Sequence, residues 1–192
     1  EMRLADHTHL MTSLGVDDIA ELASAVKDAL EVATLELEAR LWTNFAKGSQ
    51  TDAFFPKRAA PHILLGRGFL SPDTLSVTWA ETRTSDRVAV PVLSVDENKG
   101  LVQVDTERRE GFLFASYEAG FEAGIEDEDV YDLDVVPAWV QECARMAAKV
   151  NLSGPPSFKE MGVGESLKSI RSRLDHVITR HLRYAPYAEI PL

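Results

Sequence analysis

Cysteine is almost absent from this sequence, and other features that would mark a class of protein are missing as well. Cys143 is the only cysteine among 192 residues, so no disulfide can form within the chain and no cysteine-based zinc site is available. No stretch approaches the roughly 18 consecutive apolar residues of a membrane span. The opening EMRLADHTHLMTSL lacks the apolar run of a signal peptide, so we expect a cytosolic protein without membrane contact.

Sequence motifs for catalysis and cofactor binding are also missing. Gly66–Gly68 and Gly162–Gly164 are too short for a phosphate-binding loop, and no Gly-x-Ser-x-Gly motif presents a serine nucleophile. His7 and His9 lack an evident third ligand for a metal ion. The sequence therefore predicts no catalytic residue, no metal site and no cofactor.

Positive charge is scarce, because 20 Lys and Arg stand against 31 Asp and Glu, for a net charge of -11. The segment Glu118–Asp134 holds eight acids and no Lys or Arg, whereas Ser166–Leu192 holds five bases and two acids. An acidic protein is repelled by nucleic-acid phosphates unless it keeps a separate basic face. The simplest interpretation is two solvated faces. The alternative is that each segment meets its opposite on another copy or partner.

Hydrophobic periodicity predicts helices toward both ends of the chain and strands in the middle. Apolar residues at intervals of three and four predict a long helix over 17–44, and similar stripes predict helices over 137–150 and 165–184. The region 50–121 is rich in β-branched and aromatic residues separated by turn signals, and it predicts a small antiparallel sheet. Pro91 demotes its strand to an edge or a bulge.

These elements indicate an α+β fold that is mainly helical. The long N-terminal helix and the two C-terminal helices would pack as a small bundle, with a central antiparallel β-hairpin or sheet as an insertion. We expect one domain over 17–184, preceded by an arm over 1–16. An acidic loop over 122–136 interrupts the domain, and an extended tail over 185–192 follows it.

The order of several short motifs resembles that of a known family. A strand ending in SYEAGF is followed by the acidic loop, by VPAWVQECARMAAKV and by a last helix ending near YAPY. This order resembles the connector (adaptor) proteins of the head–tail junction in tailed bacteriophages. In that family a strand closing on Tyr-x-Ala-Gly-Phe/Tyr leads to a Val-Pro before a helix, matched here by Tyr117, Ala119, Gly120, Phe121, Val136 and Pro137.

The resemblance covers roughly residues 17–187, and the stretch Phe54–Val77 corresponds to the family's preceding segment. Two features depart from the family pattern. The acidic loop is longer, and the usual short helical hairpin at the start is replaced by one long predicted helix. Both departures concern subunit contacts more than the role of the protein.

The resemblance implies a structural virion protein and not an enzyme. Such proteins form a ring of identical subunits, commonly twelve, that docks beneath the portal at the capsid vertex. The ring extends the DNA channel and receives the next stopper or tail-completion protein. It therefore predicts contacts with other copies, the portal and a stopper, passage of double-stranded DNA without sequence-specific binding, and assembly in the host bacterial cytoplasm.

Two sets of side chains are candidates for these roles. The interface with a neighbouring subunit or the portal would use acids of the loop, bases of the last helix and two tyrosines: Glu126, Asp127, Glu128, Asp129, Asp132, Asp134, Lys168, Arg171, Arg173, Arg180, Arg183, Tyr184 and Tyr187. An acidic channel wall would let DNA slide where a basic wall would grip it. Candidates for that wall lie on the long helix: Asp28, Glu31, Glu36 and Glu38.

Three alternatives stay open on the sequence. One is a stopper or tail-completion ring of the same neck. Another is a small enzyme that uses paired acids such as Glu118 and Glu122. The third is a DNA-binding module built on the basic C-terminal helix, although the net charge argues against it.

Overall fold

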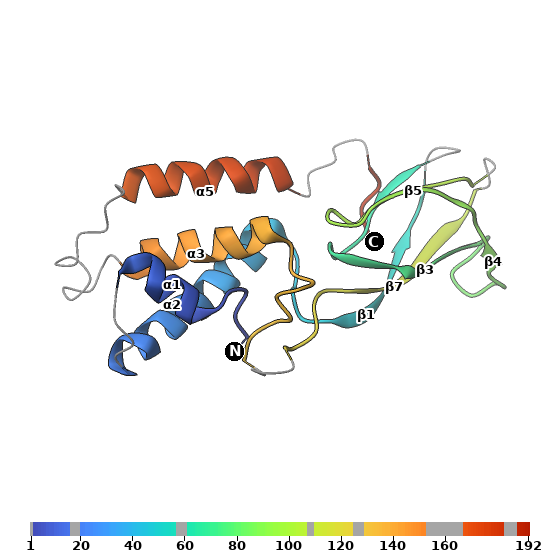
Figure 1. The fold of residues 1–192 in the computed structure, drawn as a ribbon. Helices are drawn as coiled ribbons and strands as arrows, with labels where there is room; N and C mark the ends of the chain where they lie inside the picture. Colours follow the sequence, from blue (N-terminus) through green and yellow to red (C-terminus); the bar gives the residue numbers. More distant parts are fainter. Residues whose placement is uncertain are drawn as a thin grey trace. The chain divides into compact units, whose positions relative to one another are not determined.

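The computed structural model describes residues 2–15, 20–56, 61–106, 110–124, 129–152, 167–182 and 188–192. The chain forms two compact units: unit 1 consists of Glu1–Leu41 and Phe121–Arg180, and unit 2 of Trp42–Gly120 and His181–Leu192. Figure 1 shows helices in unit 1 and strands in unit 2. None of the helices in the described ranges combines the length and apolar character that crossing a bilayer requires.

Unit 1 is built from helices packed side by side. They are α1 (His7–Leu14), α2 (Ala20–Leu41), α3 (Ala138–Leu152) and α5 (Leu167–His181). The side chain of Asp6 caps α1 by accepting a hydrogen bond from the backbone N–H of Thr8 at 2.9 Å, and Gly15 ends the helix in the left-handed conformation. Pro137 precedes α3, where its fixed φ suits a helix start.

The core of unit 1 comes from one stripe on each helix. Residues at intervals of three and four face inward because that spacing lines one side of a helix. The fully or nearly buried residues on the three longer helices include Val26, Leu30, Ala33, Leu37, Leu41, Val140, Cys143, Ala144, Ala147, Ile170, Leu174 and Ile178. Their exclusion from water supplies the main stabilisation of the unit.

Within unit 1, the N-terminal segment pairs with the C-terminal end of the acidic loop. Arg3 forms a parallel bridge with Val130, and its backbone bonds to Asp129 and Tyr131 at 2.8 and 3.0 Å. Val130 and Tyr131 are buried, and the ring of Phe121 packs edge-on against Tyr131. The loop is therefore anchored at its C-terminal end by main-chain pairing and by apolar contacts.

Unit 2 contains two antiparallel sheets. Its strands are β1 (Gly48–Phe54), β2 (His62–Leu64), β3 (Leu70–Ala80), β4 (Val88–Ala89), β5 (Val92–Asp96), β6 (Leu101–Val104) and β7 (Phe112–Ala119). The four-stranded sheet has the order β1-β7-β3-β4, and the three-stranded sheet has the order β2-β6-β5. Both sheets contribute to one apolar core, because inward-facing residues alternate with outward-facing ones along the strands.

Pro91 lies where the chain leaves one sheet for the other. It separates β4 and β5, which are edge strands of their sheets, and a register shift follows between Val92 and Ser94. A proline cannot donate to a strand ladder, so this switch point suits it. The prediction of an edge or a bulge at Pro91 is confirmed.

Several sequence expectations need correction. The fold is α+β with antiparallel sheets, as predicted, but it is not mainly helical, because two sheets make up most of unit 2. The stretch 1–16, expected to be an arm, contains α1 with Leu4 and Leu10 buried. The uninterrupted helix expected over 17–44 is not shown: α2 spans Ala20–Leu41, residues 42–44 lie beyond its end, and residues 16–19 lie outside the described part.

The tail expected to be extended over 185–192 pairs with strands of its own unit where the structure describes it. Glu189 forms a parallel bridge with Ile63 of β2, and the backbone N–H of Leu192 donates to the carbonyl of Ala53 at 2.9 Å. Residues 188–192 therefore extend the β-structure of their own unit.

Candidate functional site

Two of the motif residues behind the family resemblance, Tyr117 and Gly120, lie at a structural junction in unit 2. The hydroxyl of Tyr117 donates to Asp52 Oδ2 at 2.7 Å and accepts from the backbone N–H of Arg67 at 3.1 Å. The same carboxylate accepts from the N–H of Gly66 at 2.6 Å and, through Oδ1, from Gln50 at 2.6 Å. Since Asp52 is almost fully buried, these donors compensate the cost of removing its carboxylate from water.

Arg67 and Gly120 fix the segment that enters β1. The guanidinium of Arg67 donates to the carbonyls of Asn44, Ala46 and Gly48. Gly120 has a φ of +93°, and a Cβ there would lie 2.5 Å from the carbonyl oxygen of Ala46. Only glycine fits such a close backbone approach at a positive φ. The Tyr-x-Ala-Gly motif thus stabilises the fold of unit 2.

The predicted acidic site lies only partly within the described residues. Glu126, Asp127 and Glu128 fall outside them. Asp129 and Asp134 are exposed, whereas Asp132 uses its carboxylate to accept the backbone N–H of Asp134 at 3.1 Å in the turn before α3. The described carboxylates between Asp129 and Asp134 are therefore partly exposed.

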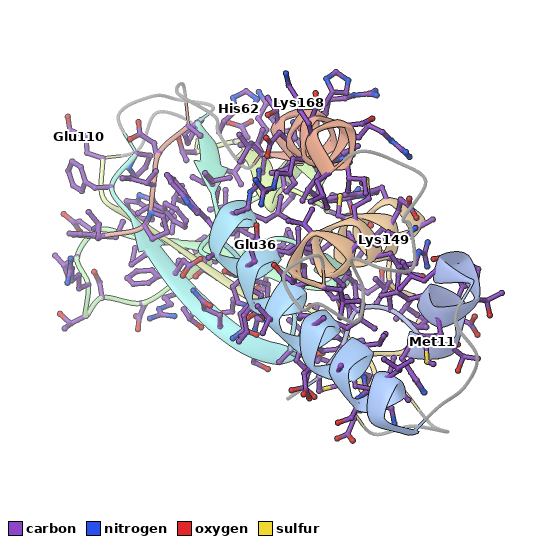
Figure 2. The ribbon with its side chains drawn as sticks, turned by 90° about the vertical axis from the view of Figure 1, so that its left-hand side faces the viewer. Met11, Glu36, His62, Glu110, Lys149 and Lys168 are labelled. Carbon is purple, nitrogen blue, oxygen red and sulfur yellow. The ribbon has the colours of Figure 1, made fainter. Side chains whose placement is uncertain are left out.

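The predicted bases of α5 form an exposed face. Lys168, Arg171, Arg173 and Arg180 are all exposed, and Figure 2 shows Lys168 on the outer side of α5. Arg171 also lines a recess that α5 shares with α2 and α3. Arg173 lies 4.0 Å from the carboxylate of Glu142 on α3. Arg183, Tyr184 and Tyr187 fall outside the described residues.

The structure does not join the two predicted charge segments within one chain. Among the described residues, no loop acid lies within 4 Å of a base of α5. The acid on α5 itself, Asp175, pairs with Arg40 of α2. The bases of α5 therefore lie on the surface of unit 1, and Arg173 is paired with Glu142 of α3.

The four acids proposed for a channel wall differ in their surroundings on α2. Glu31 lies 3.9 Å from the guanidinium of buried Arg3, and Glu36 lies 3.5 Å from Arg40. Asp28 is exposed and Glu38 is half-buried. Two of the four carboxylates therefore also support their own unit.

The described part of the chain offers little for catalysis. Burial raises the pKa of the Cys143 thiol to about 11, with a smaller contribution from the Glu142 carboxylate, so the reactive thiolate is suppressed. Glu118, a candidate for an acid pair, lies 3.8 Å from Lys47 Nζ. No cluster of three or more metal-ligating side chains is present among the residues that the structure describes.

Two recesses have polar linings without histidine or cysteine. One of about 370 Å³ lies over β1 and β7 and is lined mainly by hydroxyl groups, including Thr51 and Ser116. The other, of about 340 Å³, lies among α2, α3 and α5 beside the Arg40–Asp175 pair. Neither places a nucleophile next to a histidine base.

Sequence reasoning missed two features of unit 1. Helix α1 is short, and its signals are the Asp6 cap and the terminal Gly15. The outer side of α2 exposes Val32 and Leu35, two aliphatic residues that lie off the predicted core stripe. Because these two residues do not follow the spacing of the core stripe, their positions in the sequence indicate a second apolar face on the helix.

Comparison with known proteins shows similarity only at the level of the fold. No protein-family model matches the chain, and no curated protein sequence matches it significantly. A chain in the structure described as "Virion of native gene transfer agent (GTA) particle" matches with a TM-score of 0.53. A chain in "Neck of empty GTA particle computed with C6 symmetry" matches with a TM-score of 0.51.

Each of these two matches covers 93% of this chain and 89% of the other, at 12% sequence identity. The shared fold therefore extends over nearly the whole length of both chains. The protein therefore has the fold of chains found in structures of gene transfer agent particles, and one of those two structures is of the particle neck.

Proposed function

We propose that this chain is a structural subunit of the neck of a phage-like particle, acting as a head–tail adaptor. Copies of the chain form a ring beneath the portal, extend the DNA channel and present a platform for the next neck or tail component. The observation that carries this proposal is the shared fold, which spans almost the full length of a chain from a gene transfer agent neck. The order of motifs around Tyr117 and Pro137 points to the same role.

A ring is the expected assembly for such a subunit. The similar neck structure was computed with C6 symmetry, which suits rings of six copies or of a multiple of six. Twelve copies, the number implied by the family resemblance, satisfy that symmetry. A closed ring needs a heterologous interface, in which one face of each subunit fits a different face of its neighbour.

The exposed bases of α5 supply one side of that interface. Lys168, Arg171 and Arg180 form no ion pair with the described acids of their own chain. The acidic partner on the neighbouring subunit is either the loop that ends at Asp134 or the acids of α2. Exposed ion pairs add only about 0–1 kcal/mol each, so they set orientation more than affinity.

Net acidity suits a conduit for DNA. Duplex DNA carries one negative charge per roughly 1.7 Å of its axis, and a basic wall would retard its passage. Repulsion acts over about 8 Å at physiological ionic strength, which is the range relevant near a channel wall. The net charge of -11 per subunit is multiplied around the ring.

Incubation with isolated portal tests the adaptor role. We expect the purified chain to co-sediment with portal and to add a ring to its tail-facing end in negative-stain images. A double charge reversal, Lys168→Glu with Arg180→Glu, should weaken ring formation, whereas the matched reversal Asp73→Lys with Asp86→Lys in unit 2 should not. A chain that ignores portal but binds an adaptor–portal complex would be a stopper, and one that binds neither would contradict the proposal.

A further inference from the structure

Helix α2 carries apolar side chains on two opposite faces. Its inner face buries Val26, Leu30 and Leu37 in the core of unit 1. On the opposite face the side chain of Val32 is 54% exposed and that of Leu35 is 48% exposed. A surface helix normally opposes its apolar stripe with polar residues, and a helix that is apolar on both sides is usually covered on both. The outer face of α2 is therefore suited to a partner.

Carboxylates border this outer face. Asp28 lies one turn before Val32, and Glu31 and Glu36 flank the stripe on its two sides. Figure 2 labels Glu36 on α2 and shows that helix running along the surface of unit 1. An apolar centre with a charged border is the usual arrangement of a protein interface. A partner with basic borders would complement it.

We propose that the outer face of α2, centred on Val32 and Leu35, is the surface on which α5 of a second copy docks. The ring then closes through successive α2–α5 contacts between neighbouring subunits. This inference rests on the proposed function, because it names the interface that holds the ring together.

The outer face of α5 complements that of α2 in charge. Its centre carries the polar side chains of Ser172, His176 and Thr179, and the small serine and threonine leave room on either side of the imidazole for Val32 and Leu35 to approach the helix. Lys168 and Arg180 lie on its two sides, where their aliphatic stems can cover apolar surface while the charged ends meet the acids of α2. The hydroxyl of Thr179 already donates to the carbonyl of Asp175, so covering it costs little.

Two other contacts for this surface fit less well. Pairing of α2 with α2 of a second copy would place Asp28, Glu31 and Glu36 against the same acids, and like charges at close range repel. The acidic loop offers charge to α5, but its only exposed large apolar side chain among the described residues is Val135. Because ion pairs alone contribute little, the apolar centre of α2 decides between the two acidic surfaces.

Disulfide trapping with two separate variants tests the contact. Leu35→Cys and Ser172→Cys are purified separately, one with a size tag, and then mixed, assembled with portal and oxidised. The natural Cys143 is buried with a raised pKa and does not compete. We expect a mixed disulfide dimer from the two variants together and none from either variant alone.

The possible outcomes separate the interface from the function. A ring without the mixed dimer would overturn the α2–α5 contact and leave the adaptor role standing. Self-crosslinking of Leu35→Cys would show an α2–α2 contact, and crosslinking of Leu35→Cys to portal would show a different partner, so either overturns the inference. Failure of the chain to form any ring with or without portal would refute both proposals.

Charge exchange gives a second, independent readout. Asp28→Lys should weaken assembly, as should the pair Lys168→Glu and Arg180→Glu, and combining the changes should restore part of the loss. Separately, Leu35→Asp should raise the dissociation constant of the ring about tenfold or more, the scale of a buried interface residue. The control Leu93→Asp, at a unit 2 site of similar exposure (54%), should leave it unchanged.

Discussion

Removing one hydroxyl group from the junction in unit 2 should destabilise that unit selectively. In Tyr117→Phe, the nearly buried Asp52 loses the donor at 2.7 Å and the backbone N–H of Arg67 loses its acceptor at 3.1 Å. A hydrogen bond to a charged group is worth about 1.5–3 kcal/mol. At about 1.4 kcal/mol per tenfold change, the opening equilibrium of unit 2 should rise about 10- to 150-fold.

Hydrogen–deuterium exchange resolved to individual peptides measures this effect. Peptides from β1, β3 and β7 should exchange faster by that factor, whereas peptides from α2 and α3 should change little. The control is Ser116→Ala, which removes an exposed hydroxyl pair with Thr51 on the same two strands and should cost less than about 0.5 kcal/mol. If Tyr117→Phe accelerates exchange no more than Ser116→Ala does, the junction does not stabilise the fold as argued.

Three further predictions follow from the same structure. Gly120→Ala should lower the melting temperature strongly, because its Cβ would lie 2.5 Å from the carbonyl oxygen of Ala46. The control Gly15→Ala has nothing within 4 Å of its Cβ and should cost only about 1 kcal/mol of stability, because of its positive φ. Equal losses of melting temperature would contradict this prediction. The pKa of Cys143 is raised from 9.0 to about 11, so the thiol stays protonated throughout the neutral range. Its alkylation at pH 8 should therefore be about a hundredfold slower in the folded protein than in urea, in addition to any slowing from restricted access. Similar alkylation rates in both states would show that this site opens readily. Ring assembly should weaken as the salt concentration rises from 0.05 to about 0.5 M, because the proposed interface pairs opposite charges. Sedimentation velocity measures the oligomer distribution. If that distribution does not change with salt, charge pairing does not hold the ring together.

Much of the helical core could be predicted from local spacing. The helix over 17–44 was predicted from apolar residues at intervals of three and four, and Val26, Leu30, Leu37 and Leu41, which have that spacing, are all buried in α2. The stripe of α5 through Ile170 was equally legible. Such residues can be read from sequence because the partners that define a helix face are only three or four positions apart.

Long-range features could not be predicted in the same way. Tyr117 and Asp52 are 65 positions apart, and nothing in the local pattern pairs them. The division into two units was also hidden, because the chain crosses between them after Leu41, Gly120 and Arg180. A domain assembled from separated segments leaves no composition boundary, so the sequence suggested a single domain with a β insertion.

The candidate interface residues stay a prediction. The bases of α5 were identified from charge alone, and their exposure agrees with a role at a surface. The acids of α2 were predicted to line a channel wall from their charge alone. Charge does not show that the same helix face also exposes apolar side chains. The exposure of Val32 and Leu35 becomes visible only when the inner face of the helix is known.

Cryo-electron microscopy of the head–tail junction in purified particles tests the central proposal most directly. The account predicts a ring of this two-unit fold in contact with the portal, with α5 of each subunit against α2 of the next. A junction that lacks this fold, or a particle that assembles and transfers DNA normally after the chain is deleted, would contradict it.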